Sequence, residues 1–120
     1  MCRVLVCGGR DFNDADRVWS VLDHYHVESR GFLLVIHGAA RGADSLAGEW
    51  AEIRGVPQKA FPVTPIEWAF KGKRAGHDRN THMLREGMPT VVIAFPGGPG
   101  TANMIGQAER VGVPVLRIPA

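Results

Sequence analysis

Three glycine-rich segments, each directly after an apolar run, contain the residue types best suited to binding a phosphate. They are Gly8 to Phe12, Gly38 to Asp44 and Pro96 to Thr101. Glycine has no Cβ atom, so a phosphate can approach the backbone closely enough to accept hydrogen bonds from N–H groups. The third segment also opens a helix-like stretch, whose unpaired N–H groups and positive dipole end favour an anion. The pattern predicts recognition of a phosphate-bearing small molecule.

Three arginines lie within or next to these segments or in a motif of similar type: Arg10, Arg41 and Arg79. A planar guanidinium group suits bidentate binding of a phosphate or a pyrophosphate. Each arginine taken alone is equally well explained as a solvated surface residue. Their placement beside glycine-rich loops favours a role in binding.

Four other polar residues of these segments each admit two interpretations. Asp11 either bonds a ribose hydroxyl or orders its own turn, and His37 either donates to a phosphate or is a satisfied, partly buried histidine. Thr101 is either a further donor to the anion or a plain helix cap. For Asp44 we expect capping of backbone N–H groups at a helix start rather than chemistry.

The candidate binding site gathers the glycines and polar residues at the ends of the apolar runs. Its members are Gly8, Gly9, Arg10, Asp11, His37, Gly38, Arg41, Gly42, Asp44, Arg79, Asn80, Pro96, Gly97, Gly98, Gly100 and Thr101. If the protein is an enzyme, Arg79, Asp11 and Asp78 are the candidates for catalysis. The histidines show no i, i+4 pair and no cysteine partner at zinc spacing, so we expect no metal and no cofactor.

The elements that must position these residues alternate between short apolar runs and helix-like periodic stretches. The five apolar runs are Cys2 to Cys7, Phe32 to His37, Gln58 to Phe61, Thr90 to Phe95 and Pro114 to Ile118. Most lack polar alternation, which is typical of parallel strands buried on both faces. The βαβαβαβαβ pattern predicts a single α/β domain over residues 1–120, a Rossmann-like doubly wound sheet with the likely order 3-2-1-4-5. Ligands bind such sheets at the carboxyl ends of the strands.

One stretch, Pro62 to Gly76, does not fit this alternation. It contains two prolines, two glycines and the basic residues Lys71, Lys73 and Arg74. We expect a long functional loop or lid, with a merely solvated basic loop as the alternative. Trp68 and Phe70 within it either stack on a base or pack the loop or a subunit contact.

Composition bounds the remaining possibilities. The chain has 120 residues, of which 45% are hydrophobic and 22% charged, and a formal net charge of +2. No apolar run approaches the ~20 residues that cross a bilayer, so we expect no membrane partner. The modest charge makes nucleic-acid binding unlikely, although the basic stretch keeps it as the weakest alternative.

Cys2 and Cys7 point to opposite faces of one strand, which favours free thiols and a cytoplasmic location. Neither the P-loop nor the dinucleotide fingerprint is present.

The segment Pro96-Gly97-Gly98-Pro99-Gly100-Thr101 resembles the P-G-G-x-G-T signature of the SLOG superfamily. This Rossmann-like group includes the "Lonely Guy" lysine-decarboxylase-like phosphoribohydrolases. The segments from Gly8 to Phe12, His37 to Asp44 and Gly76 to Asn80 look like a small, uncharacterised branch of it found in bacteria and their phages. The resemblance spans nearly the whole chain. That branch usually has glycine where this chain has Ala39.

The resemblance implies either hydrolysis or binding of a nucleotide, and the absence of one glutamate distinguishes the two. In the phosphoribohydrolases an arginine, matched here by Arg79, and a glutamate just after the signature release the base from a nucleoside monophosphate. Here Thr101 is followed by Ala102, Asn103 and Met104, so the glutamate is missing. The expectation is therefore a sensor, carrier or sequestering protein for an ADP-ribose-like, cyclic or monophosphate nucleotide, with hydrolysis as the alternative. Superfamily relatives also imply a homo-oligomer, a dimer by default, and a bacterial or phage signalling or defence role.

Overall fold

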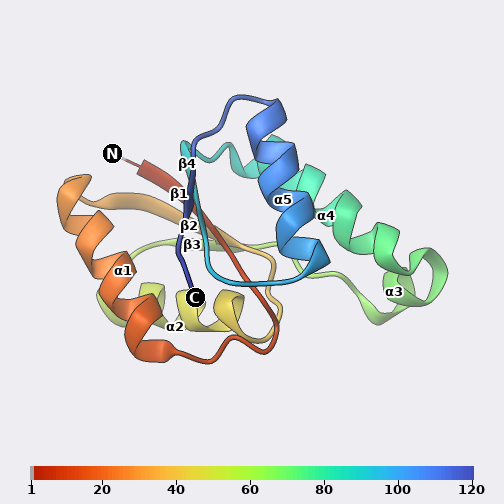
Figure 1. The fold of residues 1–120 in the computed structure, drawn as a ribbon, viewed down its shortest axis with the longest axis horizontal. Coiled ribbons are helices and arrows are strands. Elements are labelled where there is room, and N and C mark those ends of the chain that lie inside the picture. The colour runs from red at the N-terminus through yellow and green to blue at the C-terminus, as the bar shows by residue number, and fades with distance from the viewer. Residues whose placement is uncertain (1) are drawn as a thin grey trace.

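Five parallel strands form one sheet, and the longest apolar runs of the sequence lie at its centre. The structure, a computed structural model, describes residues 2–120 (Figure 1). β1 (Cys2–Cys7), β2 (Phe32–His37) and β4 (Val91–Ala94) are central, while β3 (Gln58–Ala60) and β5 (Val115–Arg117) are the edges. The order is β3-β2-β1-β4-β5, so the predicted order and the Rossmann-like α/β class are confirmed.

Both edge strands and the central β4 are shorter than the sequence predicts. Three strands end earlier than predicted: β3 stops before Phe61, β4 lies inside the run from Thr90 to Phe95, and β5 covers only Val115–Arg117. All three residues of β3 are exposed, so burial on both faces holds for the central strands and not for this edge. An edge strand pairs on one side only, and short, charged edges discourage pairing with another chain.

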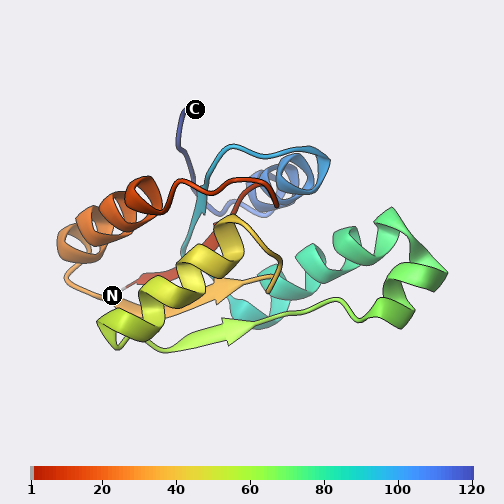
Figure 2. The ribbon, with the colours of Figure 1, turned by 90° about the horizontal axis from the view of Figure 1, so that it is seen from below.

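Helices cover both faces of the sheet in pairs. α1 (Ala15–Glu28) and α2 (Ala43–Arg54) pack on one face, and α4 (Lys73–Gly87) and α5 (Pro99–Arg110) pack on the other (Figures 1 and 2). Each pair closes its own hydrophobic core, the first around the fully buried Trp50. Side chains of β1 contribute to both cores, because successive side chains of a strand point to opposite faces of the sheet.

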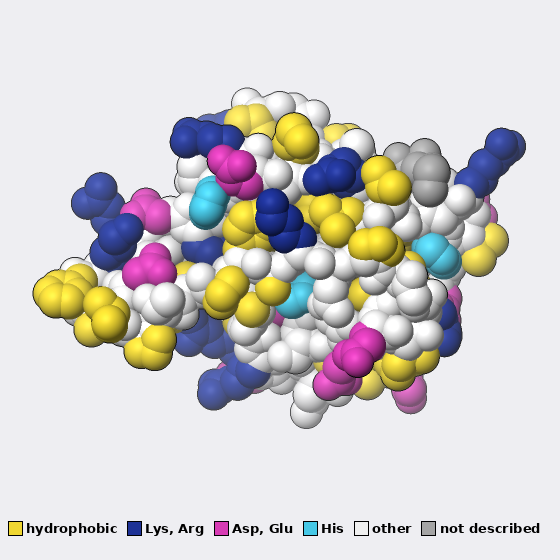
Figure 3. All heavy atoms as spheres, turned by 180° about the vertical axis from the view of Figure 1, so that it is seen from behind, with side chains coloured by type: hydrophobic (Ala, Val, Ile, Leu, Met, Phe, Trp, Pro, Cys, Tyr) yellow, Lys and Arg dark blue, Asp and Glu magenta, His cyan; other side chains and the backbone are white. Residues whose placement is uncertain are grey.

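The stretch from Pro62 to Gly76 is mostly helical, so the expectation of a long loop was wrong. It contains α3 (Pro65–Lys71) and the first turn of α4. Thr64 and Glu67 form a capping box with Pro65 at the first helical position, so local chemistry starts the helix. α3 buries no residue and protrudes at one end of the molecule, where Ile66 and Phe70 are exposed (Figures 1 and 3).

Cys2 and Cys7 are both free, as the spacing predicted. Cys2 packs against the core under α1 and α2, and Cys7 belongs to the core under α4 and α5. Across residues 2–120, every helix is too short or too polar to cross a membrane.

Candidate functional site

The three glycine-rich loops converge at the carboxyl end of the central strands, where the sheet order reverses. Gly9 N donates to the Pro96 carbonyl oxygen at 2.9 Å, which joins the loops after β1 and β4. Ala43 N donates to the Gly9 carbonyl oxygen at 3.3 Å, which joins the loop after β2 to the same point. Gly42 has a φ of +82°, and a Cβ atom there would collide with the Gly9 and Arg10 carbonyl groups. Close backbone contact is therefore one reason for glycine in these loops.

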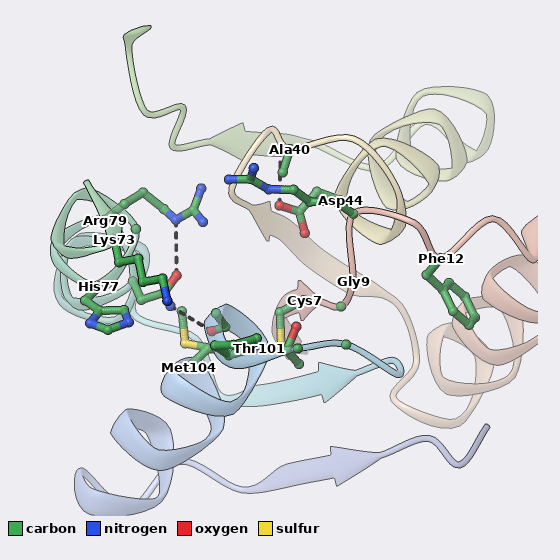
Figure 4. A pocket seen from close by; sticks show the side chains of 18 of the residues that line it. Cys7, Gly9, Phe12, Ala40, Asp44, Lys73, His77, Arg79, Thr101 and Met104 are labelled. Atoms are coloured by element: carbon green, nitrogen blue, oxygen red, sulfur yellow. Dashed lines mark hydrogen bonds between the residues drawn. The ribbon is translucent and has the colours of Figure 1, made fainter. Parts of the chain in front are cut away.

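A cavity of about 720 Å³ opens where these loops meet. That volume lies well within the range typical of small-molecule sites. Its walls come from the loops after β1 and β4, the start of α2, Trp68 of α3, and α4 and α5 (Figure 4). The candidate residues that line it are Gly8, Gly9, Arg10, Asp11, Asp44, Arg79, Asn80, Pro96, Gly97, Gly98, Gly100 and Thr101.

The first turn of α5 forms part of the cavity wall with its backbone donors uncapped. Gly98 is the N-cap, no side chain caps the helix, and Pro99 has no N–H group. The first intrahelical bond runs from Ala102 N to the Gly98 carbonyl oxygen at 3.0 Å. The N–H groups of Gly100 and Thr101 thus precede the intrahelical ladder, where helix ends accept anions. Thr101 is the third helical residue, so it is not the N-cap.

Arg79 on α4 is held rigidly at the inner side of the cavity (Figure 4). Its Nη1 donates to the Gly38 carbonyl oxygen at 2.7 Å, and its Nε donates to Asn80 Oδ1 at 3.1 Å. Asn80 Nδ2 in turn donates to the Gly100 carbonyl oxygen at 3.2 Å. Burial lowers the pKa of Arg79, and the nearby Arg10 lowers it further, while Asp44 raises it. These hydrogen bonds, which run from the Gly100 carbonyl oxygen through Asn80 and Arg79 to the Gly38 carbonyl oxygen, fix the guanidinium group. The group remains a cation because the ordinary pKa of arginine is far above neutral pH.

Asp44 ties together the loop that precedes its own helix. Its Oδ2 accepts hydrogen bonds from Gly38 N at 3.2 Å and Ala40 N at 3.3 Å. We expected it to cap N–H groups at a helix start, and its partners are instead in the loop after β2. Burial raises the pKa of this carboxyl group, against the lowering effects of the Ala40 amide and Arg79. Ala39 in that loop has a φ of +58°, a conformation that explains the glycine of the related branch.

Arg10 and Trp68 form the outer wall. The Arg10 guanidinium carbon lies 4.9 Å from the centroid of the Trp68 ring, a cation–π contact. Trp68 packs closely over Gly76, where a Cβ atom would lie 3.3 Å from the indole Cη2. Phe70, the other aromatic residue of α3, is 87% exposed and lines neither of the cavities described here.

Several candidate residues lie outside the larger cavity. Gly38 and Arg41 line a smaller chamber beside it, and Gly42 supports the loops from behind. His37 accepts from Ala39 N at 3.0 Å through Nδ1, and its Nε2 lies 2.8 Å from Gln58 Oε1, so both ring nitrogens are paired within the protein. Asp78 pairs with Lys71 at 3.4 Å on the outer side of α4.

The carboxylates are poorly placed for the role of the missing glutamate. Among residues 2–120, only Asp11 and Asp44 contribute carboxylates to the larger cavity wall. Asp11 is almost fully exposed and lies 3.4 Å from Arg41, while Asp44 is committed to two amides. In the same part of the chain, no group of three His, Cys, Asp or Glu side chains is placed to hold a metal ion.

The cavity wall also includes residues outside the candidate binding site, although the sequence had already suggested that Trp68 could stack on a base. The additional residues are mostly apolar or lie in α4: Cys7, Phe12, Ala40, Trp68, Lys73, Gly76, His77, Met83, Pro99 and Met104. Lys73 and His77 extend from the same side as Arg79 (Figure 4). Lys73 lies about two turns before Asn80 on α4 and His77 about one turn before it, a spacing that could have suggested a shared face. Burial, with a smaller contribution from Asp44, raises the pKa of the Cys7 thiol to about 12, so it is not a nucleophile.

Comparisons with known proteins agree with this geometry. A model of the family described as "YspA, cpYpsA-related SLOG family" matches residues 2–64, just over half of the chain. The "Gene 61 protein" of Mycobacterium phage D29 is 42% identical over 123 residues, covering 97% of this chain and 95% of the relative. The P-G-G-x-G-T segment lies outside the residues that the family model matches, yet it faces them across the cavity. The chain belongs to the YspA, cpYpsA-related SLOG family, whose Rossmann-like domains have a general role in binding or processing nucleotide-related ligands.

Proposed function

We propose that the protein binds a phosphate-bearing, nucleotide-derived small molecule in the larger cavity and holds it without turnover, as a sensor, carrier or sequestering protein. The observation that carries the proposal is the junction of three glycine-rich loops beside the rigidly held guanidinium of Arg79. Uncapped amides of α5 and a fixed cation lie on the same cavity wall. Such an arrangement favours a phosphate group over a neutral one.

The rest of the wall suits the nucleoside part. Apolar side chains of Phe12, Met83 and Met104 line the same cavity as the indole ring of Trp68. A site that combines a phosphate pocket with apolar and aromatic walls is typical of nucleotide recognition. In this proposal Arg10, Lys73 and Arg79 hold the phosphate, and Trp68 contacts the base.

Retention without hydrolysis follows from the carboxylates. Release of a base from a ribose phosphate needs an acid or base beside the sugar, or a carboxylate that stabilises the developing positive charge. Asp44 accepts two amide bonds, and Asp11 faces solvent beside Arg41. Asp44 is therefore committed to the loop, and Asp11 is exposed to solvent, so neither carboxylate supports that chemistry.

Thermal denaturation with a panel of ligands tests the proposal. At about 100 times its dissociation constant, a bound nucleotide adds roughly 2.7 kcal/mol and raises the melting temperature by on the order of ten degrees. We expect such shifts from at least one of AMP, GMP, cyclic AMP and ADP-ribose, and much smaller ones from the parent nucleosides. Chromatography of the same mixtures should show intact nucleotide after long incubation. Equal shifts for adenosine and AMP, or none for the whole panel, contradict the proposal.

Matched variants locate the site. Arg79→Gln and Lys73→Gln should each weaken AMP binding about tenfold or more, since each removes a charge-assisted contact to phosphate. Arg85→Gln is the control, because Arg85 is on the same helix but is exposed and lines neither cavity. Lys73 is exposed, so its variant keeps the test valid if the loss of the partly buried Arg79 impairs folding.

A further inference from the structure

A smaller chamber of about 310 Å³ lies beside the larger cavity and shares a wall with it. Arg10, Ala40, Trp68 and Arg79 line both spaces. The rest of the smaller chamber comes from the loop after β2 and from the segment that follows β3, through Gly38, Ala39, Arg41, Pro62 and Val63. The two spaces are therefore neighbouring compartments, and the planar groups of Arg10 and Trp68 stand between them.

The charged side chains that line the smaller chamber are all basic. Three arginines, Arg10, Arg41 and Arg79, line it, and within residues 2–120 no carboxylate does. Arg79 is anchored by the Gly38 carbonyl oxygen, and Arg10 faces an aromatic ring rather than an acid. Arg41 meets Asp11 at 3.4 Å, with both side chains largely exposed, so that pair is screened and weak. Arg10 lowers the pKa of Arg79, which shows that the two guanidinium groups repel each other, although Asp44 offsets part of this effect.

The volume limits what the chamber can hold. At about 310 Å³ it lies at the bottom of the range for small-molecule sites, less than half the size of its neighbour. A phosphate group and part of its linkage fit such a space more readily than a whole nucleotide does. Guanidinium forks match the oxygens of a phosphate in pairs, which favours phosphate over a simple halide.

We propose that the smaller chamber is a second anion subsite, which takes a further phosphate group of the ligand whose first phosphate lies at the start of α5. This inference rests on the proposed function and narrows its ligand class to nucleotides with at least two phosphate groups. Arg10 and Arg79 contact both parts of such a ligand. Arg41 contacts only the second phosphate, because it lines the smaller chamber alone.

Titration calorimetry with AMP and ADP tests the subsite, with Arg41→Gln as the variant. Wild-type protein should bind ADP at least about tenfold more tightly than AMP, the ratio expected for one charge-assisted contact set. Arg41→Gln should lose most of that preference. Arg74→Gln is the matched control, since its side chain is 81% exposed, lies outside both compartments and also pairs with an aspartate. It should leave both affinities unchanged.

The outcomes separate the inference from the function on which it rests. If AMP binds but ADP is no tighter, or if the ADP preference survives Arg41→Gln, the subsite is refuted and nucleotide binding stands. If neither nucleotide binds and the other ligands of the panel give no thermal shift either, the proposed function fails, and inorganic pyrophosphate then decides the subsite. Pyrophosphate binding that falls in Arg41→Gln and not in Arg74→Gln supports the chamber, and any other result overturns it. Far-ultraviolet circular dichroism confirms that both exposed-site variants are folded.

Discussion

The two sides of the larger cavity are built in opposite ways. On one side the loops at Gly9, Gly42 and Gly97 touch backbone to backbone, and a Cβ atom on Gly97 would lie 2.7 Å from the Gly9 amide nitrogen. On the other side α3 buries no residue and joins α4 through Gly72, which has open space around it. We infer that the phosphate wall is preorganised, whereas the wall that carries Trp68 is free to adjust to the rest of the ligand.

The largest effect is expected from a methyl group at the loop junction. Gly42→Ala places a Cβ atom against the carbonyl groups of Gly9 and Arg10 at a φ of +82°, so we expect a loss of about 3 kcal/mol or more. Gly72→Ala, at a φ of +57° without a nearby atom, should cost only about 1 kcal/mol. Urea denaturation measures both. Similar losses for the two variants would remove the distinction between the walls.

A pH series on Asp44→Asn examines the fixed wall. Burial raises the pKa of Asp44 in the folded protein above the value of 3.8 that it has in the unfolded chain. At a pH between the unfolded and the folded pKa, the folded protein therefore holds the proton more tightly than the unfolded chain does. Wild-type stability relative to the variant should therefore fall as the pH rises from below 3.8 through the higher folded value.

Asp23→Asn is a control in which the dependence of stability on pH should have the opposite sign. Hydrogen bonding to Arg54 lowers the pKa of Asp23 below 3.8, so its contribution is present above that value and is lost as the pH falls through the folded value. Denaturation midpoints measured from pH 3 to pH 7 for both variants should diverge in opposite directions. Parallel curves would show that burial does not raise the pKa of Asp44.

Trp68→Ala examines the adjustable wall. Trp68 is only partly buried, so we expect a loss of global stability of about 1 kcal/mol and faster tryptic cleavage at Lys71, Lys73 and Arg74. Phe70→Ala, in the same helix but with its ring 87% exposed, should change stability by less than about 0.5 kcal/mol and leave cleavage unaltered. Equal protease sensitivity in the two variants would mean that Trp68 does not hold α3 against the cavity.

The smallest effect is expected from Thr64→Ala, which removes the capping box of α3. The loss should be about 0.5 kcal/mol and confined to α3, because the helix buries no residue in the core. Amide exchange should accelerate from Ile66 to Lys71 and stay the same in α4 and the strands. Acceleration throughout the chain would show that α3 unfolds only together with the sheet.

This difference between the walls also explains what the sequence revealed. The strand order and the convergence of the glycine-rich loops were predictable, because uniformly apolar runs followed by glycines mark the central strands and their carboxyl ends. α3 was missed because Ile66, Trp68 and Phe70 form no buried stripe, although Thr64, Pro65 and Glu67 carry a readable start signal. A short helix that depends on its cap gives no periodicity to find.

Partners of single side chains were less predictable than elements. His37 pairs with Gln58 on the neighbouring strand, and Asp44 bonds amides of a loop rather than its own helix. Those contacts depend on strand register and on the turn of a loop, neither of which is encoded by local spacing. The roles of Arg10 and Trp68 likewise follow from packing that brings α3 beside the loop after β1.

The thiol at the base of the cavity has a chemical consequence of its own. With a pKa of about 12, Cys7 carries essentially no thiolate at neutral pH, so alkylating agents and peroxides find little to attack there. It acts toward a ligand as a small, neutral, polarisable contact. The cavity should therefore keep the same character in oxidising and in reducing surroundings.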